Sequence, residues 1–247
     1  MKLIQLNIWG GDLIWSALRF LKKEDADILN LQEVTAGMKE ADSFYFHTYE
    51  KLQEALKYEY SFYSPTIESR FENRTVSSGQ LILSKYPIKY RRAVYTKGKS
   101  GEYGPFSYKI PEVLLLQHAK IDVDGKMVND LNYHGCFIMG TKTGNKITES
   151  HSRKILKYMN SLDQGEQIIL SGDFNLTPNS DSLRIIGREY TDLILRNRIR
   201  TTRNELSIPK EPVDNIFVNR QVKVKSLKVP KVYVSDHLPL IMTFAWP

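Results

Sequence analysis

Short apolar segments that end in an acidic or amide side chain recur along this chain of 247 residues. Asn7 follows Leu-Ile-Gln-Leu, Glu33 follows Ile-Leu-Asn-Leu-Gln, and Asp173 and Asn175 follow Ile-Ile-Leu-Ser-Gly. Apolar runs of this length, bounded by glycine or polar residues, are typical of buried strands. If the strand ends gather at one edge of the fold, their oxygen-bearing side chains converge there, as in ligand sites on α/β sheets. The pattern predicts an α/β protein with a polar site.

The remaining segments predict helices and hairpins around those strands. Helical spacing of apolar residues predicts helices over 13–23 and 150–162, and shorter ones at 49–57 and 180–187. Strands are predicted at 2–8, 27–33, 79–84, 167–172, 213–218, 222–229 and 237–244, and the Asp-Gly within 122–125 predicts a hairpin of 113–121 with 126–134. The pattern blurs between 35 and 74, where we expect a long irregular region. These elements indicate a mixed sheet system in a single domain, 1–247.

Composition narrows the cellular setting. No segment approaches the roughly 18 apolar residues of a membrane span, and polar residues appear too early at the N-terminus for a signal peptide, so we expect a cytoplasmic protein. We also expect a monomer. The single cysteine, Cys136, fits a reducing compartment and is expected to be a small buried residue. The net charge of +7 favours polyanionic partners such as nucleic acid or anionic lipid headgroups. Richer basic stretches at 85–99, 196–203 and 223–231 are explained equally well as solvated surface.

An aspartate and a histidine in the last third of the chain suggest acid–base chemistry. Asp214 lies inside a predicted strand, where a charge is unexpected unless it is paired, and His237 stands just before the final strand. A buried aspartate that accepts a hydrogen bond from one imidazole nitrogen would leave the other nitrogen free to take a proton from water. A satisfied structural histidine is the alternative. His134, which ends another strand, is a further candidate.

The oxygen-bearing side chains at the strand ends suit a hard cation. Magnesium is favoured because it takes one or two protein carboxylates, several waters and a substrate phosphate. Taken singly, Asn7 could be a turn residue, Glu33 a surface charge, and Asp173 and Asn175 a helix or turn cap. Only their combination indicates a site.

Stretches in a fixed order along the chain resemble the endonuclease/exonuclease/phosphatase superfamily, which includes nucleases of the pancreatic deoxyribonuclease type. They are Leu6–Ile8, Asp27–Val34, Gly79–Ile88, Tyr133–His134, Ser171–Asn175 with Pro178, Val213–Asp214 and Ser235–Pro239. Gly-Asp-Phe-Asn and Ser-Asp-His with an upstream Gln-Glu are specific in combination, and the resemblance covers essentially the whole chain. It implies a four-layer α/β sandwich, with two mixed, mostly antiparallel β-sheets packed face to face and helices outside.

The resemblance also implies which residues bind metal. Glu33 would be the principal ligand with Asn7 beside it, and Asp236 would support the metal or the nucleophile. The implied cofactor is Mg²⁺, with Mn²⁺ as a substitute.

The remaining motif residues would do the chemistry. His237, oriented by Asp214, would be the general base, while Asp173 and Asn175 would position the attacking water and the phosphate. His134 would contact the phosphate or help to protonate the leaving group. The leading hypothesis is therefore a metal-dependent nuclease or related phosphodiesterase acting on DNA or RNA.

Two alternatives stay open. One is a phosphodiesterase or phosphatase acting on a lipid or inositol phosphate, and the other is a non-catalytic nucleic-acid-binding module. The Trp-Gly-Gly after the first motif and the Gln-Glu-Val of the second differ from the forms associated with abasic-site endonucleases, and Asn215 stands where an aromatic residue often follows the aspartate.

Loop placement suggests further substrate contacts. Arg70, Arg74, Lys142 and Lys146 are candidate phosphate contacts, although solvated charge is the simpler explanation. The aromatic run from Tyr58 to Tyr63 could stack bases, and core packing explains it at least as well.

Overall fold

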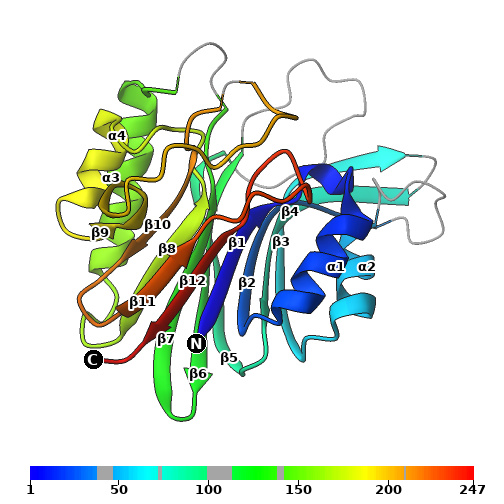
Figure 1. The fold of residues 1–247 in the computed structure, drawn as a ribbon, viewed down its shortest axis with the longest axis horizontal. Coiled ribbons are helices and arrows are strands. Elements are labelled where there is room, and N and C mark those ends of the chain that lie inside the picture. Colours follow the sequence, from blue (N-terminus) through cyan, green and yellow to red (C-terminus); the bar gives the residue numbers. More distant parts are fainter. Residues whose placement is uncertain (38–46, 72–73, 99–112, 138–141, 209) are drawn as a thin grey trace.

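Two six-stranded sheets face each other with helices on their outer surfaces, so the predicted four-layer α/β sandwich is confirmed (Figure 1). The computed structural model describes all residues except 38–46, 72–73, 99–112, 138–141 and 209, and the side chains of 70–74 also lie outside the described part. The first sheet has the order β11 (Lys223–Lys228), β12 (Leu240–Ala245), β1 (Lys2–Asn7), β2 (Ile28–Ala36), β4 (Arg74–Ser84) and β3 (Tyr60–Phe71). The second has the order β5 (Ile88–Lys97), β6 (Leu114–Val123), β7 (Lys126–His134), β8 (Gln167–Asp173), β10 (Asp214–Val218) and β9 (Thr191–Asp192).

Both sheets are mixed, because each contains one parallel pair among antiparallel neighbours. β1 pairs in parallel with β2, and β7 with β8. A helix connects the strands of each parallel pair, as such a crossover requires. These two pairs bring the carboxyl ends of four strands to the same end of the sandwich.

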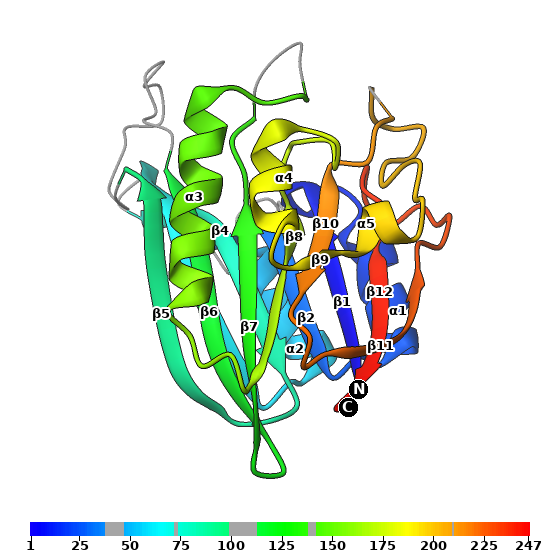
Figure 2. The same ribbon diagram turned by 90° about the vertical axis from the view of Figure 1, so that its left-hand side faces the viewer.

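The helices cover the outer faces of the sheets (Figures 1 and 2). α1 (Ile14–Glu24) and α2 (Thr48–Leu56) bury apolar side chains against β1, β2 and β4, while α3 (Lys146–Asn160) and α4 (Asp181–Gly187) do so against β6, β7 and β8. Two short helices, η1 (Trp9–Gly11) and α5 (Leu193–Arg196), were not predicted. α3 begins four residues earlier than expected because Asn145 and Thr148 form a capping box there. No helix within the described residues is long and apolar enough to cross a membrane.

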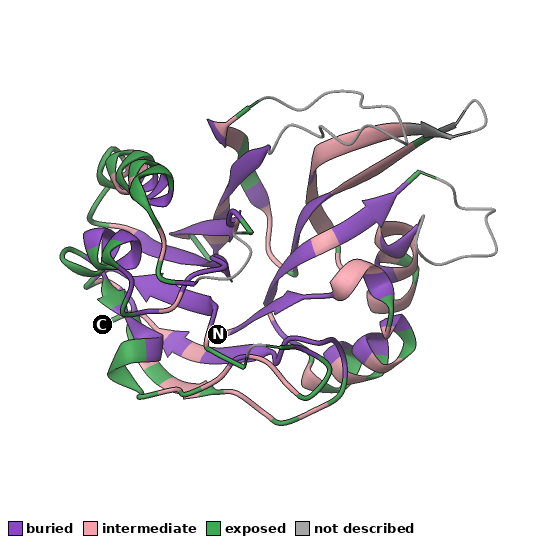
Figure 3. Cartoon of the chain, turned by 90° about the horizontal axis from the view of Figure 1, so that it is seen from above, coloured by how far each residue is buried: buried purple, intermediate pink, exposed green. Residues whose placement is uncertain are grey.

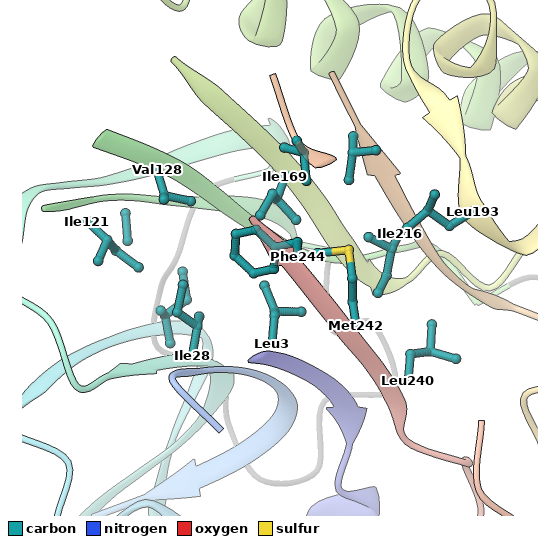
Figure 4. Packing of buried hydrophobic residues seen from close by; sticks show 14 of the residues in the cluster. Leu3, Ile28, Ile121, Val128, Ile169, Leu193, Ile216, Leu240, Met242 and Phe244 are labelled. Carbon is teal, nitrogen blue, oxygen red and sulfur yellow. The ribbon is translucent and has the colours of Figure 1, made fainter. Parts of the chain in front are cut away.

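The side chains between the sheets change in character along the strands. Near the chain termini they are apolar and include Leu3, Ile28, Val128, Ile169 and Ile216 (Figure 4). Further along the same strands, at successive inward positions two residues apart, buried polar side chains replace them: Gln5 and Asn7, Asn30 and Gln32, Asp130 and Asn132, and Ser171 and Asp173. Seen from above, burial is concentrated in the strands and in the inward sides of the helices (Figure 3). The interface thus passes from a dry core to a polar end.

One expectation was wrong. The blurred region between 35 and 74 is not irregular throughout, because β3 runs from Tyr60 to Phe71 and pairs with the whole of β4. The period-two pattern is obscured where Pro65 and Ile67 mark a register shift. Within this region the side chains of Arg70 and Arg74, two candidate phosphate contacts, lie outside the described part.

The aromatic run at the start of β3 packs into the structure. Tyr60 and Phe62 lie against the core between the sheets, and Tyr58 and Tyr63 against the core beneath α1 and α2. The hydroxyl of Tyr58 donates to the Ala26 carbonyl at 2.6 Å. Core packing therefore accounts for this run. Cys136 is buried, as expected.

The predicted hairpin between β6 and β7 is confirmed. Asp124 and Gly125 both have positive φ, 53° and 84°, which is the signature of a type I′ turn. The Gly125 amide also donates to the Asp122 carboxylate at 2.8 Å. The turn fixes the register in which Val123 pairs with Lys126, and hence the position of His134 at the far end of β7.

Candidate active site

Three neighbouring strands of the second sheet place three candidate residues side by side. Asp173 at the end of β8 is in register with His134 at the end of β7 and with Asp214 at the start of β10. Gly172 makes the close approach of β7 and β8 possible, because a Cβ atom there would lie 1.9 Å from the carbonyl oxygen of Tyr133. Gly172 is therefore a structural requirement of the site as well as part of a motif.

The first sheet contributes Asn7 and Glu33. β1 ends at Asn7, opposite Gln32 of β2. The register of β2 against β4 shifts between Leu31 and Val34, and Glu33 has a positive φ of 57°. Such an irregularity redirects a side chain next to an active site, at the cost of a backbone conformation that non-glycine residues seldom adopt.

The amide of Asn7 joins the two sheets. Its Nδ2 donates to Glu33 Oε1 at 2.8 Å and to Asp173 Oδ2 at 3.1 Å, while its Oδ1 accepts from the Trp9 amide at 2.9 Å. His134 Nε2 lies 3.8 Å from Glu33 Oε1 and 3.7 Å from Asp173 Oδ2. Glu33 and His134 keep 36% and 28% of their side chains exposed, against 2% for Asp173, so they form the mouth of the site and Asp173 its floor.

His237 and Asp214 form a tightly held pair. His237 Nδ1 lies 3.0 Å from Oδ1 and 2.8 Å from Oδ2 of Asp214. The same carboxylate accepts from Gln5 Nε2 at 2.9 Å and from Thr202 Oγ1 at 2.6 Å. With Nδ1 engaged, His237 Nε2 faces Asp173 Oδ2 at 3.5 Å. The pair therefore has one fixed orientation, with Nε2 directed into the site.

The charge state of His237 follows from its surroundings. Burial by itself lowers the pKa of the imidazole, but the carboxylates of Asp214 and Asp173 outweigh burial and raise the pKa to about 9. The ring is thus protonated at neutral pH among these carboxylates. It can accept a proton from water only where further positive charge offsets them.

Asp236 lies beside the pair. Its Oδ1 is 3.9 Å from His237 Nε2 and accepts from Ser235 Oγ at 3.3 Å, while its Oδ2 lies 3.3 Å from Arg203 Nη1. Arg203 also forms an isolated β-bridge with His237, which links the backbone at Arg203 to the Ser-Asp-His motif.

Asn175 completes the group and has an unexpected partner. Its φ is 55°, and its backbone N–H donates to Asp173 Oδ1 at 2.9 Å. Lys142 Nζ donates to Asn175 Oδ1 at 2.9 Å and lies 4.2 Å from the centre of the Phe137 ring. Only 8% of Lys142 is exposed, and this burial lowers the pKa of its ammonium group. Solvated charge, the simpler explanation from sequence, is therefore wrong for Lys142, whereas Lys146 is exposed.

The structure brings all eight candidates from the sequence into one group: Asn7, Glu33, His134, Asp173, Asn175, Asp214, Asp236 and His237. Sequence reasoning missed Gln5, Thr202 and Arg203, which hold Asp214 and Asp236 in place. Gln5 carried a signal, because it interrupts an apolar strand at an inward position. Thr202 and Arg203 come from a segment without periodicity and gave none.

The donor set suits a hard divalent cation. Asp173, Asp214 and His237 offer ligand atoms within 4.8 Å of one another, but Asp214 and His237 are already bonded to each other. Glu33 is the carboxylate that stands open to solvent, and Asn7 beside it could offer its amide oxygen by turning the group. Oxygen donors of this kind fit Mg²⁺ better than a softer metal.

A cavity of about 470 Å³ opens from the mouth of the site towards β3, β4 and β6. Its described lining comprises Glu33, Thr66, Ile67, Ser78, Gly79, Gln80, Val113, Leu114, His134, Gly135 and Phe137. Within that lining only Glu33 and His134 can carry charge. The cavity is large enough for an uncharged organic group next to the site.

A protein-family match extends over most of the chain. A family model described as the endonuclease/exonuclease/phosphatase family matches residues 4–237. The chain belongs to this family. Its members are metal-dependent enzymes that hydrolyse phosphate esters, which agrees with the hard-cation donor set around Glu33. No curated protein sequence matches the chain.

Solved structures of the family share the fold at low sequence identity. A family protein from Bacteroides vulgatus is 20% identical with a TM-score of 0.72, and the match covers 100% of this chain and 98% of that one. A mannosyl-6-phosphatase from Bacteroides thetaiotaomicron is 16% identical with a TM-score of 0.72 over 100% of both chains. The human Nocturnin catalytic domain, with bound sulfate, is 19% identical with a TM-score of 0.66 over 100% of this chain and 94% of that one. At such identities the likeness shows the fold alone.

Proposed function

We propose that this protein hydrolyses phosphodiester bonds in nucleic acid with Mg²⁺ as cofactor. The observation that carries the proposal is the His237–Asp214 pair, whose carboxylate also accepts bonds from Gln5 and Thr202 and whose Nε2 faces Asp173. A general base needs this fixed tautomer and orientation. The net charge of +7 supports a polyanionic substrate.

Each residue has a step in the proposed reaction. A water oxygen attacks phosphorus, its proton passes to Nε2 of His237, and the ester P–O bond on the opposite side breaks. Asp173 and Asn175 orient the water and the phosphate, and His134 at the mouth contacts the phosphate or protonates the departing oxygen.

Glu33, Asn7 and Asp236 are the residues proposed to hold the metal. A bound divalent cation would offset the carboxylates around His237 and neutralise charge on the phosphate. Mn²⁺ would substitute for Mg²⁺. We further propose that the protein acts as a cytoplasmic monomer.

The neutral cavity beside Glu33 and His134 favours one further substrate class. Apart from Glu33 and His134, its described lining is uncharged and could receive the organic group of a phosphate monoester. A lipid, inositol or sugar phosphate is therefore the second candidate, hydrolysed by the same residues.

The test is a hydrolysis panel of single- and double-stranded DNA, RNA, inositol phosphates, a sugar phosphate and sphingomyelin, each with Mg²⁺, Mn²⁺ or chelator. Wild type is compared with His237→Ala and with His118→Gln, which changes a buried histidine on β6 away from the site. We expect metal-dependent cleavage of nucleic acid that is lost in His237→Ala and kept in His118→Gln. Cleavage confined to the inositol phosphates, the sugar phosphate or sphingomyelin would favour the second candidate, and full activity of His237→Ala would refute the mechanism.

A further inference from the structure

The excess positive charge of the chain comes from a single stretch of sequence. Residues 196–231 contain ten Lys and Arg and three Asp and Glu, a net charge of +7. The rest of the chain balances, with 25 residues of each sign. The net charge of the chain is therefore equal to that of this stretch.

Nine of these basic side chains are exposed, and within the described residues none of the nine forms an ion pair. We call them the basic edge: Arg196, Arg198, Arg200, Lys210, Arg220, Lys223, Lys225, Lys228 and Lys231. The tenth, Arg203, is mostly buried and bonded to Asp236. Of the three acidic residues, Asp214 is buried against His237, so the exposed surface is even more positive than the sequence.

The basic edge follows one side of the sandwich. α5 and the segment after it lie next to β11 and β12 at the margin of the two sheets (Figure 2). Ile194 and Ile199 from the first segment share one apolar cluster with Val224 and Leu227 from β11. The two basic stretches are therefore fastened together by a common core, with their charged side chains facing solvent.

The part of the basic edge that contains Lys210 and Lys231 lies next to the candidate active site. Lys210 and Lys231 line a cavity of about 230 Å³ together with Arg203. Arg203 contacts Asp236 and forms the bridge to His237. A polyanion lying along β11 would thus arrive directly beside the proposed catalytic pair.

We propose that the basic edge binds the sugar–phosphate backbone of a nucleic-acid strand whose scissile phosphate lies at His237. This inference rests on the proposed function and adds where the uncleaved part of the substrate lies. The basic side chains follow β11 and the loops at either end of it towards the candidate active site, and such a linear arrangement suits an extended polyanion. A membrane surface would need them in one plane, and the exposed apolar residues in and next to this stretch lie apart along the chain, on α5 and in two loops: Leu195, Leu206, Ile208 and Tyr233.

The test removes three charges from β11 in the full-length protein. Lys223→Gln/Lys225→Gln/Lys228→Gln is compared with Lys22→Gln/Lys23→Gln/Lys157→Gln, which changes the same number of exposed lysines on α1 and α3. Binding of a fluorescent 30-nucleotide oligothymidylate is measured by anisotropy with chelator present, over a range of salt concentrations. We expect the β11 variant to bind about 10-fold or more weakly, with the slope of log K against log salt reduced by about 2, because each backbone contact releases about 0.7 counterion on a single strand. The control should stay within about twofold of wild type.

A second readout separates this inference from the proposed function. Both triple variants should hydrolyse bis(p-nitrophenyl) phosphate, a small diester that cannot reach β11, at the wild-type rate. Equal oligothymidylate binding by the two variants would refute the proposed role of the basic edge. The role would also be refuted if the wild type bound phosphatidylserine vesicles but not oligothymidylate, and only the β11 variant lost the vesicle binding. The wild type could cleave no substrate of the panel while the β11 variant alone loses oligothymidylate binding. That result would support the basic edge and refute the proposed function.

Discussion

Asp214 and Asp130 are both fully buried between the sheets, yet their surroundings differ. Asp214, at the polar end of the interface, accepts hydrogen bonds from Gln5 and Thr202 and pairs with His237. Asp130, in the middle, accepts one bond from Asn30 at 2.8 Å, and its Oδ2 has no partner within the described residues. Burial raises the pKa of Asp130 to about 7, against the opposing effect of Asn30.

The difference shows where this interface can hold charge. Without an opposite charge and several donors, a buried carboxyl tends towards its neutral form. Among the described residues the polar end supplies both to Asp214, through His237 and two further hydrogen-bond donors, Gln5 and Thr202. The candidate site is therefore confined to one end of a polar interface that extends well below it.

Replacing either aspartate with asparagine should reveal the largest difference between the two regions, in the rate of catalysis. Asp214→Asn keeps the shape but takes away the negative partner of His237, so we expect kcat to fall by about 10³- to 10⁴-fold. Asp130→Asn is the same chemical change in the same interface and should leave kcat within about twofold of wild type. Steady-state hydrolysis of a small diester, with melting temperatures to confirm folding, measures both. Equal losses would mean that the two carboxylates do not differ in function.

Asp130, rather than Asp214, should have a measurable effect on the pH dependence of stability. Folded Asp130 titrates near pH 7 and the unfolded group near 3.8, so the folded state binds more protons in that window and loses stability as pH rises through it. Asp130→Asn does not titrate. Between pH 5 and 8, wild type should therefore lose about 3 kcal/mol of unfolding free energy relative to the variant, measured by urea denaturation. Parallel pH curves would show that Asp130 is already ionised at pH 5.

The contrast between the site and the rest of the molecule also shows which features could be predicted from the sequence. The strand-end pattern and the ordered motifs predicted the two sheets and a candidate site that the structure assembles, because the motif residues lie at or next to the ends of clearly apolar segments. The partners of Asp214 were harder, since Thr202 lies in a segment without periodicity. β3 was missed where a register shift at Pro65 breaks the alternation. Lys142 was undervalued because sequence alone does not show that a lysine is buried.

His118, which lies outside the interface between the sheets, should give a pH dependence of stability opposite in sign to that of Asp130. Burial lowers the pKa of this imidazole to about 4, although its bond to Asn129 opposes the shift. The unfolded state, with a pKa near 6.5, therefore binds more protons, and stability falls as pH drops through 6.5 towards 4. From pH 7.5 to 5, wild type should lose about 2 kcal/mol relative to His118→Gln in the same denaturation experiment. A slope of the other sign would mean that the ring is charged in the fold.

The smallest effect should come from the support of Asp214 rather than from the carboxylate itself. Thr202→Val keeps the shape but removes the hydroxyl that donates to Asp214 at 2.6 Å, so the pair stays charged but is less firmly held. Losing one hydrogen bond to a charged group is worth about 1.5 kcal/mol, which corresponds to a roughly 10-fold fall in kcat with little change in KM. Thr243→Val, which removes a hydroxyl paired with Ser226 at 2.7 Å on another strand, is the matched control and should keep full activity. If both variants were fully active, His237 alone would suffice to orient Asp214, and the contrast with Asp130 would depend on charge rather than on the number of donors.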